Sequence, residues 1–286
     1  MSGTASIANP RRCLLFVPGS RPERFEKAIA TGVDQVCIDL EDAVASDDKD
    51  SAREVTFEFL ARVPVSRSEV GLRLNPLGTD LGRRDLEALA DSGLAPAFVM
   101  LPKVETVSEL EDADAALDGR GTALIAQIET PRGLLDARAL AAATPRLQAL
   151  MFGGFDFIVA LRGRACWESF FQPRVQLALI AAEAGIGCID VPFLDIRDED
   201  GLVAESDRVI ALGFTAKAAI HPAQVDPIQQ RYLPTADELA RARRVIEALA
   251  SSGGSAVQLD GKLVDRPIEI AAERALALGA HGVRPG

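Results

Sequence analysis

Hydrophobic and polar residues follow one another in a regular order along the chain: short apolar runs rich in Val, Ile and Leu are each followed by a longer amphipathic stretch. An apolar run of about four to eight residues between polar, Gly or Pro boundaries predicts a strand, and apolar positions three and four apart predict a helix. The predicted strands are residues 13–17, 35–40, 71–74, 98–101, 123–128, 149–152, 187–191 and 216–220. The predicted helices between them are residues 22–31, 48–62, 81–92, 107–117, 134–143, 171–184 and 199–212.

This alternation of strands and helices predicts the fold. Strands separated by helices of this length pair in parallel, because each helix crosses back over the sheet. Eight such units match a closed barrel better than an open doubly wound sheet. No Gly-x-Gly-x-x-Gly motif follows the first apolar run, which disfavours a dinucleotide-binding fold. We therefore predict an α/β protein with the (β/α)8 TIM-barrel fold.

The pattern changes after the eighth strand. A polar helix is predicted over residues 235–250, and the run SSGGS at 251–255 has the composition of a flexible linker. Alternation on both sides of Asp260-Gly261 predicts a hairpin, and a last helix is predicted over 267–278. The expected organisation is a flexible tail at 1–10, a barrel catalytic domain at 11–250, and a linker with a small C-terminal lid at 251–286.

The amino-acid composition limits the kinds of partner that we expect the protein to bind and the cellular compartment in which we expect it. The formal net charge of −11 disfavours nucleic acid or an anionic membrane as the main partner, because both are held through Lys and Arg. No apolar stretch approaches the length of a membrane span, and the first residues have no apolar signal core. The four cysteines lack CxxC spacing and lie mostly in apolar runs, which predicts buried, reduced thiols. We expect a cytoplasmic protein.

Charged residues follow the predicted strands, where barrel enzymes carry their active sites. Carboxylates gathered there repel one another, and a bound cation offsets the repulsion; oxygen donors favour a hard ion such as Mg²⁺. Glu129 and Asp156 are the candidate ligands, and water or a substrate oxygen would complete the shell. Arg73 is placed to pair with a substrate carboxylate. Asp39, Glu41 and Asp42 at the end of the second predicted strand cannot all be ligands, because neighbouring strand residues point to opposite faces. Glu41 and Asp42 are expected to orient the ligands.

Other interpretations of these residues stay open at this point. Glu129 could cap the helix after it, Asp156 could be the N-cap of its own helix, and Arg73 could pair with Glu41 or Asp42. Lys103 could form a Schiff base, as lysines at barrel strand ends can.

Two classes of site are disfavoured by what the sequence contains. The chain has two histidines, His221 and His281, which disfavours a Ser-His-Asp triad or a histidine-rich zinc site.

Seven ordered motifs give the chain a family resemblance. They are LLFVPGSRPERFEKA (14–28), CIDLEDAV (37–44), LRLNPLGT (72–79), VMLPKVET (99–106), IAQIETPRGLL (125–135), AIHPAQV (219–225) and DGKLVDRP (260–267). With these motifs the chain resembles the aldolase/citrate lyase β-subunit-like proteins of the HpcH/HpaI aldolase superfamily, which include malyl-CoA lyases. The resemblance implies a TIM barrel, usually a homotrimer, that binds Mg²⁺ and makes or breaks a carbon–carbon bond between an acyl thioester and a 2-oxo acid.

The resemblance also assigns roles to particular residues. Glu129 and Asp156 match the family's metal ligands, and Arg73 matches the arginine that holds the oxo acid. The residues that fall where related enzymes contact substrate or CoA are Phe16, Arg21 and Lys27. Asp265 matches an aspartate on a C-terminal lid contributed by the neighbouring subunit. One position departs from the family pattern: Phe155 stands where members often have Glu, which bears on substrate preference.

The hypothesis is a Mg²⁺-dependent lyase that acts on a 3-hydroxyacyl thioester of the citryl-, malyl- or citramalyl-CoA type. It would release or condense a 2-oxo acid such as oxaloacetate, glyoxylate or pyruvate, with Arg73 as the carboxylate clamp and Asp265 moving the proton of the thioester enolate. Alternatives are thioester hydrolysis at the open metal site, the β subunit of a multi-subunit citrate lyase that needs a carrier-bound thioester, and a binding protein without catalysis.

Overall fold

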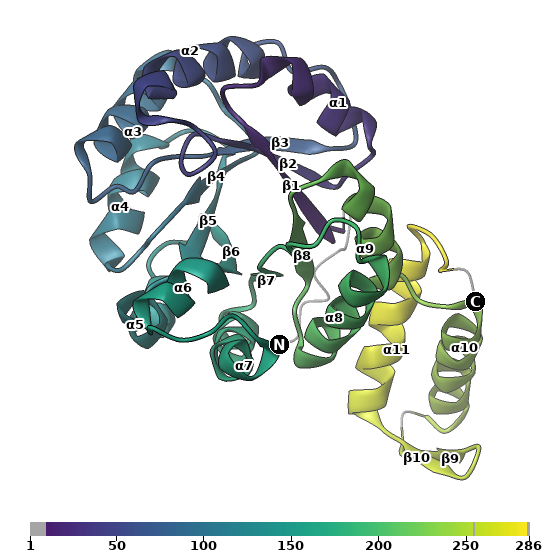
Figure 1. Cartoon of the computed structure of the whole chain (residues 1–286). Coiled ribbons are helices and arrows are strands. Elements are labelled where there is room, and N and C mark those ends of the chain that lie inside the picture. The colour runs from purple at the N-terminus through teal and green to yellow at the C-terminus, as the bar shows by residue number, and fades with distance from the viewer. Residues whose placement is uncertain (1–9, 254, 285–286) are drawn as a thin grey trace. The chain divides into compact units, whose positions relative to one another are not determined.

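The computed structural model describes residues 10–253 and 255–284, which form two compact units that divide between Ile228 and Gln229. The first unit, from Arg11 to Ile228, is a closed barrel of eight parallel strands surrounded by helices (Figure 1). Its strands are β1 (Cys13–Pro18), β2 (Gln35–Asp39), β3 (Glu69–Arg73), β4 (Phe98–Leu101), β5 (Ala123–Ile128), β6 (Leu147–Phe152), β7 (Gly187–Asp190) and β8 (Ala216–Ala219). The predicted TIM-barrel fold is confirmed, and the observed strand ends differ from the predicted ones by at most two residues.

The helices of the barrel unit fall between the strands and after the last one. They are η1 (Pro22–Arg24), α1 (Phe25–Ala30), η2 (Ser46–Asp48), α2 (Lys49–Leu60), α3 (Asp80–Ser92), α4 (Val107–Ala116), α5 (Pro131–Ala141), α6 (Gly154–Ala160), α7 (Trp167–Ala184), α8 (Glu199–Leu212), η3 (Pro222–Gln224) and α9 (Val225–Arg231), the last of which extends across the division. The short helix α6 was not predicted by the hydrophobic pattern. It begins directly at the Gly153-Gly154 turn that follows β6.

Alternate residues of each strand point into the barrel, as strand geometry requires. The interior is a single cluster that includes Leu14, Cys37, Met100, Ile125 and Ala218. Pairing of β1 with β8, in which Leu14 lies opposite Ala218, closes the ring. Because side chains fill the interior, the chemistry is confined to the strand ends.

The C-terminal unit is a helix pair with a small hairpin. It contains α10 (Ala236–Ser251), β9 (Val257–Leu259), β10 (Lys262–Val264) and α11 (Arg266–Gly279). Val245, Leu249, Val264 and Ala272 form its own core.

This unit begins earlier than the predicted lid. The expected division after residue 250 assigned the polar helix to the barrel, whereas the compact unit begins at Gln229 and includes α10. The first residue of the run SSGGS, Ser251, ends α10, and the Ser252 hydroxyl donates a 2.6 Å hydrogen bond to the Ser255 carbonyl. Residue 254 of the predicted linker lies outside the described residues. The expected tail at 1–10 lies almost wholly outside the described residues.

A buried ion cluster holds helices to the outer side of β7 and β8. Arg174 on α7 donates to both carboxylate oxygens of Asp190, at 2.7 and 3.0 Å, and Lys217 donates to Asp190 at 2.6 Å. Glu205 on α8 completes the cluster with a 2.8 Å contact to Lys217. Arg174, Asp190 and Lys217 are fully buried, so removing one charge leaves the others uncompensated in a low-dielectric environment.

Among the described residues, no helix is both long and apolar enough to cross a membrane. Three of the cysteines, Cys13, Cys37 and Cys188, are buried and unpaired as predicted, and burial raises the pKa of each thiol. Cys166 is also unpaired, but it is exposed at the start of α7, because it stands in a polar connection and not in a strand.

We predict that Lys217→Met lowers the free energy of unfolding by about 3 to 5 kcal/mol, because it leaves Asp190 with less compensation. Urea unfolding provides the measurement. As a control, Arg138→Met removes the exposed ion pair with Glu183 and is expected to change stability by less than about 1 kcal/mol. Equal effects of the two substitutions would show that the buried cluster does not stabilise the barrel.

Candidate active site at the carboxyl ends of the strands

A cavity of about 440 Å³ opens at the carboxyl ends of the barrel strands. Its polar lining residues are Asp39, Asp42, Arg73, Gln127, Glu129 and Asp156. Its apolar lining includes Phe16, Met151, Phe155, Val191, Leu194 and Ile220. The predicted metal ligands and the predicted clamp arginine therefore line one cavity, although they are far apart in the sequence.

Arg73 is held in place by the acidic residues of the neighbouring strand. Its Nε and Nη2 donate to the two oxygens of Asp39 at 2.8 and 2.6 Å, which is a bidentate pair. Its Nη1 lies 2.9 Å from a Glu41 oxygen and donates a longer, 3.3 Å bond to Gln127. The guanidinium also lies over the Phe16 ring, 4.9 Å from its centre. The ion-pair interpretation of Arg73 is thus correct for Glu41, and the same guanidinium lines the cavity.

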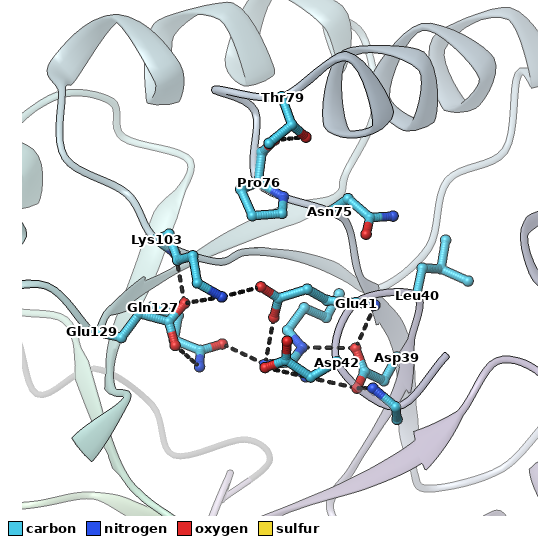
Figure 2. A network of polar contacts seen from close by, with 12 residues as sticks. Asp39, Leu40, Glu41, Asp42, Asn75, Pro76, Thr79, Lys103, Gln127 and Glu129 are labelled. Carbon is cyan, nitrogen blue, oxygen red and sulfur yellow. Dashed lines mark hydrogen bonds and ion pairs between the residues drawn. The ribbon is translucent and has the colours of Figure 1, made fainter. Parts of the chain in front are cut away.

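Glu129 is the most buried carboxylate of the cavity, with its side chain fully covered. One of its oxygens accepts a 2.7 Å hydrogen bond from the Lys103 backbone N–H, and the other accepts a 2.8 Å bond from the Gln127 amide (Figure 2). Burial raises the pKa of Glu129 to about 8, with the charge of Glu41 adding to the effect against the opposing charge of Lys103. The capping interpretation is wrong, since the Thr130 hydroxyl caps α5 by accepting from Gly133 at 3.0 Å.

Two backbone features make room for this carboxylate. Lys103 has a positive φ of 52°, a left-handed conformation that is costly for a residue with a side chain and that accompanies its N–H bond to Glu129. Gly153 packs directly on Glu129: a Cβ at this position would lie 2.3 Å from the Glu129 Cβ. A side chain at 153 would therefore displace the carboxylate.

The Lys103 ammonium pairs with Glu41, and the two side chains point toward one another in Figure 2. Burial alone would lower the pKa of Lys103, but the hydrogen bond to Glu41 and the charge of Glu129 raise it. Burial in turn raises the pKa of Glu41, although Arg73 and Lys103 both act to lower it. A Schiff base needs a neutral amine, so this protonated lysine does not fit that mechanism.

Asp156 lies in the first turn of α6, where its exposed carboxylate lines the cavity. Gly153, not Asp156, is the N-cap residue of this helix, so the capping interpretation is wrong here as well. The charge of Asp156 raises the pKa of Glu129, which places the two carboxylates within electrostatic reach of each other.

The donors present suit a hard divalent cation. Glu129 and Asp156 offer carboxylate oxygens on one cavity, which are the ligands that Mg²⁺ prefers. Within residues 10–253 and 255–284, no group of three or more His, Cys, Asp or Glu side chains is arranged to hold a metal. A cation between these two carboxylates would therefore keep positions open for water and substrate, as Mg²⁺ usually does.

The remaining predicted residues are more scattered. Phe16 lines the cavity, and Asp42 lies on its edge, 4.0 Å from Arg73. Arg21 and Lys27 are exposed on the segment that follows β1 and do not line the cavity. Asp265 is the N-cap residue of α11 in the C-terminal unit.

Two residues have clear roles that were not predicted. Asp39, which was considered only as one of three possible ligands, forms the bidentate pair with Arg73, and Gln127, which was not considered, bridges Arg73 and Glu129. Strand alternation carried a signal for both. Gln127 is two residues before the predicted ligand Glu129, and Asp39 is two residues after Cys37, which points into the barrel. Alternation along a strand therefore places each beside the site.

Fold and site together define a (β/α)8-barrel protein with a carboxylate-rich cavity at the carboxyl ends of its strands. The chain belongs to the HpcH/HpaI aldolase/citrate lyase family, whose model matches residues 12–222. It is 31% identical to citrate lyase subunit beta of Haemophilus influenzae, over 96% of this chain and 98% of that protein. It is also 31% identical to human mitochondrial citramalyl-CoA lyase, over 94% of this chain and 85% of that protein. A solved structure of CitE from Mycobacterium tuberculosis with magnesium, acetoacetate and coenzyme A superposes with a TM-score of 0.80 at 34% identity, covering 94% and 98% of the two chains.

We predict that metal-free protein loses stability relative to Glu129→Gln as the pH rises. The folded-state pKa of about 8 exceeds the ordinary value of 4.5, so the folded state binds the extra proton between these values and stability falls as that proton is lost. The free energy of unfolding of the unsubstituted protein, minus that of Glu129→Gln, should fall by about 3 kcal/mol from pH 5 to pH 8. Urea unfolding in EDTA measures it. A difference that does not change with pH would show that Glu129 titrates normally.

Proposed function

We propose that the protein is a Mg²⁺-dependent carbon–carbon lyase that acts on a 3-hydroxyacyl thioester and releases, or condenses, a 2-oxo acid. The observation that carries the proposal is the cavity in which buried Glu129 and exposed Asp156 lie with Arg73. Family membership and relatives named citrate lyase subunit beta and citramalyl-CoA lyase support the same chemistry.

Glu129 and Asp156 would hold the cation. When bound, Mg²⁺ supplies positive charge that polarises a carbonyl and stabilises an enolate oxygen. The protein fixes Glu129 for this task through the Lys103 N–H and the Gln127 amide, so little reorganisation is needed on binding. Of the relatives above, the mycobacterial CitE structure is described as a complex with magnesium.

Arg73 would bind the carboxylate of the oxo acid. Asp39 fixes one edge of the guanidinium, which sets its orientation before any ligand arrives. The longer contacts, 3.3 Å to Gln127 and 4.0 Å to Asp42, are the ones a substrate carboxylate can replace at small cost. Glu41 forms ion pairs with both Arg73 and Lys103, and these pairs keep the charges beside the clamp compensated while the oxo acid binds.

The proposal extends to residues outside the cavity. Arg21 and Lys27 are exposed cations with which a CoA phosphate can pair. Asp265 would move the proton that creates or quenches the thioester enolate, and it would be delivered to the cavity of a neighbouring subunit in a homotrimer. We place this enzyme in the cytoplasm.

The second candidate is a citrate lyase β subunit that requires a carrier-bound thioester, and the identity to citrate lyase subunits beta favours it. Purified protein with Mg²⁺ and malyl-CoA, citramalyl-CoA or citryl-CoA separates the two by release of the keto acid. We expect turnover of at least one thioester without any partner. Turnover restored only by an acyl-carrier protein would favour the second candidate, and no turnover in either case would contradict both.

Two variants test whether this activity belongs to the cavity. Glu129→Gln is expected to lower kcat/KM at least about 100-fold, because a neutral amide binds the cation weakly. Glu87→Gln, a matched change on the exposed face of α3, should leave kcat/KM within about twofold. Comparable losses in both variants would mean that the cavity is not the site.

A further inference from the structure

The lining of the cavity is partly charged and partly apolar. The charged side chains come from β2, β3 and α6 and from the residues that follow β2 and β5. The apolar wall, as we call it, is formed by Phe155 on α6, Leu194 after β7 and Ile220 after β8. Three of the apolar side chains reach toward solvent at its mouth: Phe155 is half-buried, Leu194 is 58% exposed and Ile220 is 42% exposed. Exposed side chains of this size that line a cavity are suited to cover an apolar part of a ligand. Phe155 is fixed there by edge-to-face packing on Phe170, at 5.9 Å between ring centres.

Positive charge in this cavity is scarce. Arg73 is the single cation among the described residues that line it, against the four carboxylates Asp39, Asp42, Glu129 and Asp156. Its guanidinium is already committed to Asp39 and Glu41. The ammonium of Lys103 is paired with Glu41, and Lys103 is not among the lining residues.

This balance of charges suits a substrate that has one carboxylate group and disfavours a substrate that has two. The first carboxylate is neutralised by the bound cation and by Arg73, where it replaces the longer contacts to Gln127 and Asp42. A second would enter a cavity rich in negative charge without a counter-ion, or would lie against Phe155, Leu194 and Ile220, which displace part of its water and offer no hydrogen bond in return. An alkyl group in the same place gains apolar contact instead.

We infer that the cavity selects a 2-oxo acid, and hence a 3-hydroxyacyl thioester, whose remaining substituent is an uncharged alkyl group and not a second carboxylate. The inference rests on the proposed function, and it narrows the oxo acid to the pyruvate type as opposed to the oxaloacetate type. Leu194 and Phe155 are the specificity-determining residues.

Calorimetric binding of two oxo acids tests the inference without relying on turnover. 2-Oxobutyrate and freshly dissolved oxaloacetate have the same four-carbon chain, but the first has a methyl group where the second has a carboxylate. Titrated into the full-length protein with saturating Mg²⁺, 2-oxobutyrate should bind at least about tenfold more tightly. Equal affinity, or tighter binding of oxaloacetate, would overturn the inference and leave the proposed function standing. Binding of neither acid would contradict the proposed function itself, and the inference with it.

A pair of arginine substitutions assigns the preference to the apolar wall. Leu194→Arg supplies the missing counter-ion and should shift the ratio of the two affinities toward oxaloacetate by about tenfold or more. Leu179→Arg makes the same change at a leucine that is 67% exposed on α7 and does not line the cavity, so it should leave the ratio unchanged. An unchanged ratio in Leu194→Arg, with folding verified by circular dichroism, would show that this wall does not select the substrate.

Discussion

The rest of the site depends on one electrostatic constraint: several carboxylates lie together in a partly enclosed cavity that contains little positive charge. Glu41 and Glu129 are both buried, and Arg73 and Lys103 lie close enough to compensate them. The compensation is incomplete at Glu129, where burial raises the pKa to about 8. Such a group favours either a proton or a cation, and this is why an acidic cavity of this kind is suited to hold a divalent ion.

The barrel places the site residues at the ends of its strands, and a few backbone features fix the exact positions of their side chains. Alternation along β5 places Gln127 and Glu129 on the same side, where they are joined by a hydrogen bond. The left-handed Lys103 brings its N–H to Glu129, and Gly153 leaves the space into which the carboxylate fits. Rigid strands and tight turns thus fix the candidate ligands before any ligand binds, which is a general requirement of efficient active sites.

Much of this arrangement could be predicted from the sequence, because its signals are local. Apolar runs gave the eight strands, and their last residues pointed to Glu129, Asp156 and Arg73. Contacts between distant segments could not be read in the same way: the grip of Asp39 on Arg73 depends on which neighbouring strands pair and in what register. The inclusion of α10 in the compact C-terminal unit is a similar case, since the tertiary packing that defines this unit leaves no mark on a polar helix.

We propose that Glu129 and Asp156 jointly hold a divalent cation. Crystals grown with Mn²⁺ in place of Mg²⁺ test it most directly, because anomalous scattering from manganese locates the ion independently of any assumed site. We expect one strong anomalous peak within ligand distance, about 2.0 to 2.3 Å, of a carboxylate oxygen of each residue. A peak elsewhere in the molecule, or no peak in the cavity at saturating Mn²⁺, would contradict it.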